Sequence, residues 1–338
     1  MQVVITTIFP PTEGARKLAE GLEKAGPEAS LWVVGDRKGP ESYDLPATRF
    51  FSIDEQKGLP FQLARLLPEK SYTRKNLGYL LAMREKPACI VETDDDNIPR
   101  EDFWETRSSL SNAREVGLQG WYNAYRSFTE TRIWPRGLPL EKLQESWQRG
   151  DLASEATTPG ESLIQQGLAD ENPDVDAVFR LTADLPISFD PAPPVRLTAG
   201  CWCPFNSQNT TFFPQAFPLL YLPSHCTFRM TDIWRSFVAQ RCLWSMGSTL
   251  LFSKATVFQQ RNEHNLLRDF EDEIPGYLLN DRIRELLSQV SLKEGRETAV
   301  VCENLRRCYE ALVRENIVAT GELELVSAWI ADISAILA

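Results

Sequence analysis

Short apolar runs alternate with stretches of helical periodicity in the first third of the chain. Residues 3–8 form a β-branched apolar run that ends at Pro10-Pro11, and a helix is predicted next, from a Thr12 cap to Gly26. The same reasoning predicts strands at residues 31–34, 50–53 and 89–92 and a helix at residues 71–84. Strands that alternate with helices predict an α/β fold in which helices cover both faces of a mainly parallel sheet.

The rest of the chain is less regular. Residues 150–176 are polar with little periodicity and predict a long loop, and residues 185–194, with four prolines, predict extended chain. A helix is predicted at residues 231–246, and a short apolar run follows at residues 249–252. Apolar positions then recur at spacings of three and four, so residues 281–338 are predicted to form a C-terminal helical appendage.

Length and composition narrow the class of protein. A chain of 338 residues predicts about two domains, or one large domain with an appendage. Lys and Arg number 36 against 47 Asp and Glu, and the resulting net charge of −11 disfavours nucleic-acid binding. The N-terminal residues do not resemble a secretion signal, and no apolar stretch reaches the ~18 residues of a membrane span. Seven cysteines without zinc or redox spacing predict reduced thiols and a cytoplasmic location.

Three consecutive carboxylates, Asp94, Asp95 and Asp96, directly follow the apolar run at residues 89–92. Because adjacent carboxylates repel one another, a cation is needed to offset the free energy of bringing them together. Their hard oxygen atoms suit Mg²⁺ or Mn²⁺, ions that also bridge a diphosphate. The alternative is a solvated acidic turn in which Asn97 caps a helix.

Other polar groups are expected at the same edge of the sheet, where the strands end. The edge would gather Thr6, Asp36 and the aspartate triplet, since ligands of parallel sheets bind at the carboxyl ends of the strands. Arg74 and Lys75 lie at a predicted helix start, which favours an anion such as phosphate. A solvated basic first turn would carry the same residues.

Two residues in the second half are candidates for chemistry. Asp232 is followed one helical turn later by Arg235, and an ionised aspartate can accept a proton from an acceptor hydroxyl. The alternative role of Asp232 is that of a helix cap. His264 could complete the coordination of a metal held by aspartates, or could simply be hydrogen-bonded. The P-loop, the Gly-x-Ser-x-Gly elbow and the dinucleotide-binding glycine fingerprint are all missing from the sequence.

Several motifs, in this order along the chain, resemble the STELLO-type glycosyltransferase domain found in plants, nematodes and microbes. The resemblance covers about residues 30–280 and rests on Val33-Val34-Gly35-Asp36-x-Lys38, Ser71-Tyr72-x-Arg74-Lys75-Asn76-x-Gly78-Tyr79, Thr93-Asp94-Asp95-Asp96-Asn97-x-Pro99, Ile133-Trp134-Pro135-Arg136-Gly137, Pro204-Phe205-Asn206-Ser207-Gln208-Asn209-Thr210, Thr227-Phe228-Arg229-x-x-Asp232-Ile233-Trp234-Arg235 and Arg261-Asn262-x-His264-Asn265. A more distant similarity reaches the reversibly glycosylated polypeptides, which include UDP-arabinopyranose mutases. We expect neither family to contain a counterpart of the helices after about residue 281.

The resemblance implies a GT-A-type, Rossmann-like fold with a mixed, mainly parallel sheet and the C-terminal helices beside it. Residues 1–280 would be the glycosyltransferase domain, with a nucleotide-sugar half at about 1–110 and an acceptor half at about 111–280. It further implies a metal ion, Mn²⁺ or Mg²⁺, on Asp94, Asp96 and His264, and a nucleotide-sugar donor, with a UDP-sugar favoured. The donor-binding residues carried over are Thr6, Asp36, Lys38, Arg74, Asn76, Asp94, Asp95, Arg136 and Asn209.

Three functions remain open from the sequence. The favoured one is a metal-dependent hexosyl- or pentosyltransferase that moves sugar to a hydroxyl of a glycan or another acceptor, with inversion and with Asp232 as general base. The second is a nucleotide-sugar mutase, for which Arg136 would bind or carry the sugar. The third is a non-catalytic module that binds a sugar nucleotide.

Overall fold

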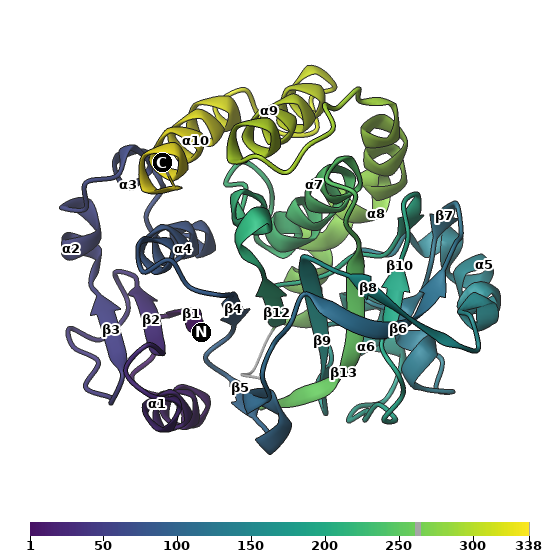
Figure 1. Cartoon of the computed structure of the whole chain (residues 1–338), viewed down its shortest axis with the longest axis horizontal. Coiled ribbons are helices and arrows are strands. Elements are labelled where there is room, and N and C mark those ends of the chain that lie inside the picture. Colours follow the sequence, from purple (N-terminus) through teal and green to yellow (C-terminus); the bar gives the residue numbers. More distant parts are fainter. Residues whose placement is uncertain (261–264, 338) are drawn as a thin grey trace.

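A computed structural model describes residues 1–260 and 265–337 (Figure 1). The strands are β1 (Gln2–Thr7), β2 (Ser30–Gly35), β3 (Thr48–Phe51), β4 (Ile90–Thr93), β5 (Asn97–Pro99), β6 (Leu110–Val116), β7 (Gly120–Trp121), β8 (Thr157–Glu161), β9 (Ile164–Asp170), β10 (Val195–Leu197), β11 (Cys201–Trp202), β12 (Asn209–Phe212) and β13 (Leu250–Gln259). The α-helices are α1 (Glu13–Ala25), α2 (Ile53–Lys57), α3 (Gln62–Leu66), α4 (Lys75–Arg84), α5 (Leu143–Gln148), α6 (Ala177–Thr182), α7 (Thr231–Ser245), α8 (Leu266–Gln289), α9 (Thr298–Arg314) and α10 (Glu322–Leu337).

One 11-stranded mixed sheet runs through the molecule in the order β3-β2-β1-β4-β12-β9-β13-β10-β6-β8, with β5 paired to β13. The first four strands of this order pair with one another only in parallel, as in a Rossmann-like half. The pairing then changes, because β12 lies antiparallel between β4 and β9. The α/β class with a mixed sheet and C-terminal helices, expected of a GT-A-type fold, is therefore confirmed.

The predicted elements of the N-terminal half form, except that the strand predicted at residues 50–53 is β3 (Thr48–Phe51) and Ile53 begins α2. The Thr12 hydroxyl caps α1 by accepting from the backbone N–H of Ala15, and the helix buries an apolar stripe that includes Leu18 and Leu22. Helix α4 packs on β1 and β2, on the face of the sheet opposite to α1 (Figure 1). This sandwich places the carboxyl ends of β1, β2 and β4 at one edge.

The prediction of a long loop at residues 150–176 is wrong, because much of this segment forms strands β8 and β9. Strand β9 lies in the middle of the sheet, between β12 and β13. Its Gln166 is buried, and its side-chain oxygen accepts from the Asn206 N–H over 2.9 Å and the Thr210 hydroxyl over 3.0 Å. Because residues distant in the sequence satisfy the hydrogen-bonding groups of Gln166, a polar residue can occupy a buried position of this strand. The strand therefore lacks the continuous apolar run by which the other strands were predicted.

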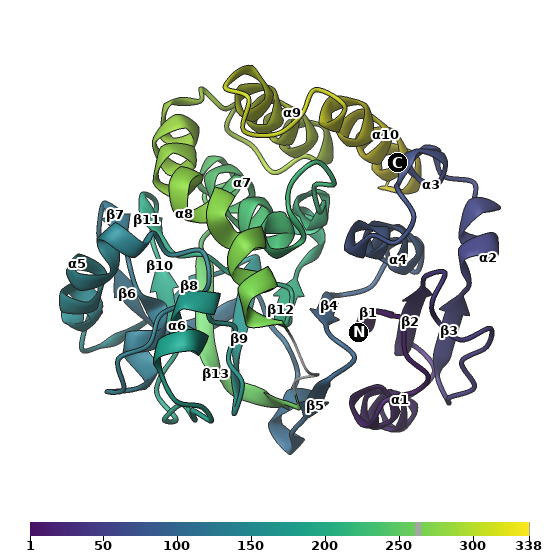
Figure 2. The same cartoon turned by 180° about the vertical axis from the view of Figure 1, so that it is seen from behind.

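The C-terminal helices pack against the N-terminal half. Asp332 of α10 accepts hydrogen bonds from the backbone N–H groups of Gln62 and Leu63, and so caps α3. Glu322, at the start of α10, accepts from the Tyr221 hydroxyl. The predicted boundary at residue 281 falls inside α8, which spans Leu266–Gln289 (Figure 2).

Candidate active site

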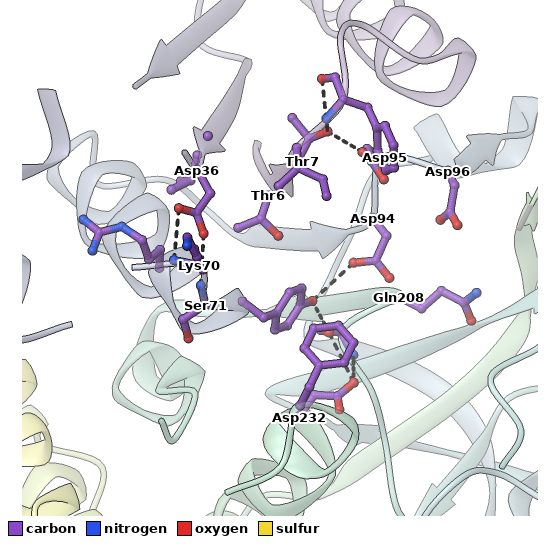
Figure 3. Close-up of a pocket in the computed structure, with 18 of the residues that line it drawn as sticks. Thr6, Thr7, Asp36, Lys70, Ser71, Asp94, Asp95, Asp96, Gln208 and Asp232 are labelled. Atoms are coloured by element: carbon purple, nitrogen blue, oxygen red, sulfur yellow. Dashed lines mark hydrogen bonds between the residues drawn. The ribbon is translucent and has the colours of Figure 1, made fainter. Parts of the chain in front are cut away.

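A cavity of about 590 Å³ opens where β1, β2 and β4 end, and the start of α7 forms its opposite wall (Figure 3). This is the position in which open α/β sheets bind ligands. The cavity is lined by most of the residues that the sequence nominated, namely Thr6, Asp36, Lys38, Arg74, Asp94, Asp95, Asp96, Arg136 and Asp232.

The aspartate triplet divides its side chains between two tasks. Asp95 turns toward β1, where its carboxylate accepts a hydrogen bond from the Thr7 hydroxyl. Asp94 and Asp96 face the cavity (Figure 3). The side-chain amide of Gln259 donates to both oxygens of Asp96 over 3.1 Å. The two outer carboxylates therefore line the cavity, and the middle one holds the turn against β1.

Desolvation raises the pKa of two carboxylates in this cluster, Asp94 and Asp95. Desolvation is the main reason that the pKa of Asp94 rises to about 6; the Lys75 ammonium lowers it, and the negative charges of Asp95 and Asp232 raise it. Burial also raises the pKa of Asp95, against the lowering effect of the Thr7 hydrogen bond. A divalent cation with hard oxygen ligands would relieve this desolvated charge, so the residues fit Mn²⁺ or Mg²⁺.

The described residues do not by themselves complete a cage for a metal ion. Within residues 1–260 and 265–337, no three His, Cys, Asp or Glu side chains are grouped so as to hold a metal ion. Mg²⁺-type sites commonly use one or two carboxylates and take their other oxygens from phosphate and water. Asp94 and Asp96 suit that division, whereas His264, the predicted third ligand, lies outside the described residues.

The helix start at residues 72–76 carries two basic side chains, which have different roles. Arg74 lines the cavity, yet its Nε and Nη1 donate to Gln56 and to backbone carbonyls at Leu67 and Pro68. Lys75 is fully buried, and its Nζ donates to the Thr93 carbonyl over 2.7 Å and lies 3.4 Å from Asp94 Oδ1. Lys75 thus supports the end of β4.

Two predicted donor-binding residues are not among those that line the cavity. The amide of Asn76 exchanges two hydrogen bonds of 2.9 Å with the backbone of Leu222. The amide of Asn209 donates to the Leu168 carbonyl and the Thr256 hydroxyl. Both are buried amides that join separate segments of the fold.

Asp36 lines the cavity while it shapes the neighbouring loop. Its carboxylate accepts from the backbone N–H groups of Arg37, Lys70 and Ser71 over 2.7–3.1 Å (Figure 3). These bonds hold the loop before the helix start against the end of β2. Lys38, two residues further, is exposed on the cavity wall.

A buried ion-pair network forms the wall opposite the triplet. Arg136 donates from Nη1 and Nη2 to the two oxygens of Asp232 over 3.0 and 2.9 Å, and from Nε and Nη2 to Asp174 over 2.8 and 2.7 Å. The Arg136 guanidinium also donates to the Arg229 carbonyl. These bonds stabilise the charged form, so the pKa of Asp174 falls to about 2 despite its burial.

The cavity-lining residues that sequence reasoning missed include Tyr72, Asp174, Ser207 and Gln259. Tyr72 and Ser207 lie within motifs that the sequence had already marked, so the family resemblance could have nominated them. Asp174 lies in the segment that was predicted to be a loop, and Gln259 ends a strand of which only the first residues were recognised. Nothing in the local sequence pattern identifies these last two.

Comparison with known proteins relates the chain to one family. Residues 229–337 match the model of a family described as STELLO glycosyltransferases. The chain is 30% identical over 266 residues to "Probable glycosyltransferase STELLO1" of Arabidopsis thaliana, and 31% identical over 275 residues to "Probable glycosyltransferase STELLO2" of the same plant. These matches cover 72% and 75% of this chain but 33% and 35% of the relatives, so the chain spans about a third of their length.

The family match also covers the C-terminal helices. Because it reaches residue 337, the expectation that this region lacks a counterpart in the family is wrong. A solved structure described as a mycobacterial protein superposes with a TM-score of 0.41 and 10% identity, over 82% of this chain and 74% of that chain. Among the described residues, no helix has the length and apolar character that crossing a membrane requires.

Proposed function

We propose that this chain, which is related to the STELLO glycosyltransferases, transfers a sugar from a nucleotide-sugar donor to an acceptor hydroxyl with the help of Mn²⁺ or Mg²⁺. One observation carries the proposal: Asp94, Asp96 and Asp232 line the same cavity at the carboxyl edge of the sheet. The cavity could thus hold a donor at Asp94 and Asp96 and an acceptor at Asp232 at the same time.

The donor would lie against the ends of β1, β2 and β4. Asp94 and Asp96 would hold the cation, which when bound neutralises charge on the leaving diphosphate. Arg74 and Lys38 line the cavity and add positive charge for the phosphates, and we favour a UDP-sugar as the donor. Thr6 and Asp36 line the part of the cavity that borders β1 and β2.

Asp232 would act on the acceptor. Arg136 donates a hydrogen bond to each oxygen of the Asp232 carboxylate and so holds it in place, and this carboxylate would receive the proton of an acceptor hydroxyl. Attack by that hydroxyl from the side opposite the diphosphate would invert the configuration at the anomeric carbon. The side-chain and backbone groups of Ser207 donate to the same carboxylate and orient it.

The bonding of Arg136 favours transfer over the mutase alternative. All three guanidinium nitrogens of Arg136 donate to protein oxygens, on Asp174, Asp232 and Arg229. A guanidinium held in this way is poorly suited to carry a sugar, because its positive charge and its N–H groups are already engaged. Arg136 fits a positioning role for Asp232 better.

The test begins with binding. Thermal unfolding of the protein with a panel of nucleotide sugars, with and without Mn²⁺, should show a cation-dependent rise in Tm with one nucleotide class. That donor is then incubated with candidate acceptors, using wild-type protein and Asp232→Asn. We expect Asp232→Asn to bind donor but to transfer sugar at least ~10²-fold more slowly.

The outcomes separate the three functions. Ring-isomerised donor formed without any acceptor would favour the mutase, and binding without transfer would favour the non-catalytic module. Transfer by Asp232→Asn at the wild-type rate would remove Asp232 as the base. Asp44→Asn, in an exposed loop outside the cavity, is the matched control and should behave like wild type.

A further inference from the structure

Two hydroxyl groups connect the donor side of the cavity to the acceptor side. The Tyr72 hydroxyl lies 3.2 Å from Asp94 Oδ1 and contacts the Ser207 hydroxyl. The Ser207 hydroxyl lies 3.3 Å from Asp232 Oδ2. A continuous hydrogen-bonded path therefore leads from Asp94 through Tyr72 and Ser207 to Asp232, and Figure 3 shows the two aspartates facing each other across the cavity.

The number of protons on this path restricts how it can be bonded. Each hydroxyl carries one proton and can donate only one full hydrogen bond. Lys75 Nζ donates to the Tyr72 oxygen over 2.9 Å, so the Tyr72 proton has to go elsewhere. If Tyr72 donates to Asp94, the contact between Tyr72 and Ser207 is a hydrogen bond only when Ser207 is its donor. The Ser207 hydroxyl then no longer donates to Asp232. If Tyr72 donates to Ser207, Ser207 donates to Asp232 and Asp94 receives nothing from Tyr72.

We propose that Tyr72 and Ser207 are positioning residues that form a two-state hydrogen-bond relay, through which occupation of the donor site at Asp94 directs the Ser207 hydroxyl to Asp232. The proposal rests on the function proposed above. Tyr72 turns its proton away from Asp94 when a cation occupies that carboxylate, because the cation repels the proton and takes the lone pair that accepts it. Ser207 then donates to Asp232 and orients it for the acceptor.

The surroundings of the path favour a switch between two states over a gradual change. Ser207, Asp232 and Lys75 are all at least nine-tenths buried, which strengthens the hydrogen bonds that they make, whereas Tyr72 and Asp94 are partly exposed. The Tyr72 ring is fixed by edge contact with Phe228 and by the Lys75 ammonium, which lies 5.0 Å from the ring centroid. Only the hydroxyl protons need to move.

Coupling is reciprocal, and this gives a test by binding alone. We would measure the Kd of UDP in the presence of saturating Mn²⁺, for wild type and Asp232→Asn, each with and without Tyr72→Phe. The neutral amide that Asp232→Asn introduces accepts from Ser207 less strongly than the carboxylate does, which favours donation by Tyr72 to Asp94 and weakens cation-dependent binding. In the Tyr72→Phe background, Asp232→Asn acts only through the loss of its charge.

We expect Asp232→Asn to weaken Mn²⁺-dependent UDP binding by a factor at least about twofold larger in wild type than in the Tyr72→Phe background. Ser207→Ala should abolish the difference in the same way. Tyr122→Phe is the matched control, because Tyr122 also contacts a serine hydroxyl, that of Ser127 at 2.7 Å, without lining the cavity. In the Tyr122→Phe background, Asp232→Asn should weaken Mn²⁺-dependent UDP binding by the same factor as in wild type.

Equal factors in the wild-type and Tyr72→Phe backgrounds would overturn the relay while leaving the donor site intact. A change in the factor with Tyr122→Phe as large as that with Tyr72→Phe would also overturn it, because a general structural effect would then explain both. If wild-type protein binds no UDP with Mn²⁺, Mg²⁺ or no cation, the UDP site proposed here is refuted, and the relay that rests on it is refuted as well.

Discussion

Arg136 and Asp232 stand 96 positions apart in the sequence, yet the guanidinium meets the carboxylate through two hydrogen bonds. The same guanidinium binds Asp174 through two more. One arginine thus joins the loop after β9 to the first turn of α7, and it fixes the carboxylate that we propose as the base. The acceptor side of the cavity depends on this contact for both its shape and its charge.

Removing Arg136 should destabilise the fold strongly. Arg136→Met leaves Asp174 and Asp232 buried without their common counter-charge, and we expect the free energy of unfolding to fall by about 3–5 kcal/mol. Urea unfolding followed by circular dichroism measures the change. Arg49→Met is the control, since its ion pair with Glu85 is exposed and should contribute less than about 1 kcal/mol. A loss below about 1 kcal/mol for Arg136→Met would show that the network is not stabilising.

Asp96→Asn should remove the cation dependence of nucleotide binding. The substitution keeps the size of the side chain and its place beside Gln259 but takes away a charged oxygen ligand. We expect the Kd of the nucleotide with Mn²⁺ to rise at least about tenfold, and the Kd without a cation to change little. Calorimetric titration of the variant beside Asp44→Asn checks this. A Mn²⁺ effect that survives in Asp96→Asn would exclude Asp96 as a ligand.

Asp176 should make stability depend on pH between about 4 and 6. Burial raises its pKa from 3.8 to about 6, against the lowering effect of hydrogen bonds from Phe179 N–H and Trp134 Nε1. The folded state therefore binds the proton more tightly than the unfolded state, so this group's contribution to stability is greatest below pH 3.8 and is lost as the pH rises through about 6.

Asp176→Asn removes that penalty and can still cap α6 through its side-chain oxygen. Relative to wild type, the variant should gain about 2–3 kcal/mol as the pH rises from about 4 to about 7, with no further gain at higher pH. Urea unfolding at several pH values measures the difference. A difference that does not vary with pH would place the pKa of Asp176 near its ordinary value.

A chain that ends at residue 290 should not fold cooperatively. It lacks α9 and α10, and with them Asp332, the cap of α3, and Trp329, which is fully buried and donates to the Pro218 carbonyl over 3.0 Å. Circular dichroism with thermal unfolding tests the shortened chain against the full one. A sharp transition in the shortened chain would show that these helices are a separable appendage.

The amino-acid sequence by itself was enough to locate β1, β2 and β4, helix α1 and the aspartate triplet. The strands are continuous apolar runs, and the cap and end of α1 are local signals, so each needs only a few neighbouring residues to form. A carboxylate triplet behind such a run had to lie at the edge of a parallel sheet. The family resemblance rested on equally local motifs.

Only the tertiary structure decided which polar groups satisfy one another. Strand β9 is invisible as a pattern because Gln166 is paired with residues about forty positions away, and Asp174 belongs to the site only because Arg136 reaches it. Asn76 and Asn209, polar residues within motifs, form hydrogen bonds that connect segments distant in the sequence. A buried polar group is stable wherever a partner meets it, and that partner's position is set by the packing of distant segments rather than by local periodicity.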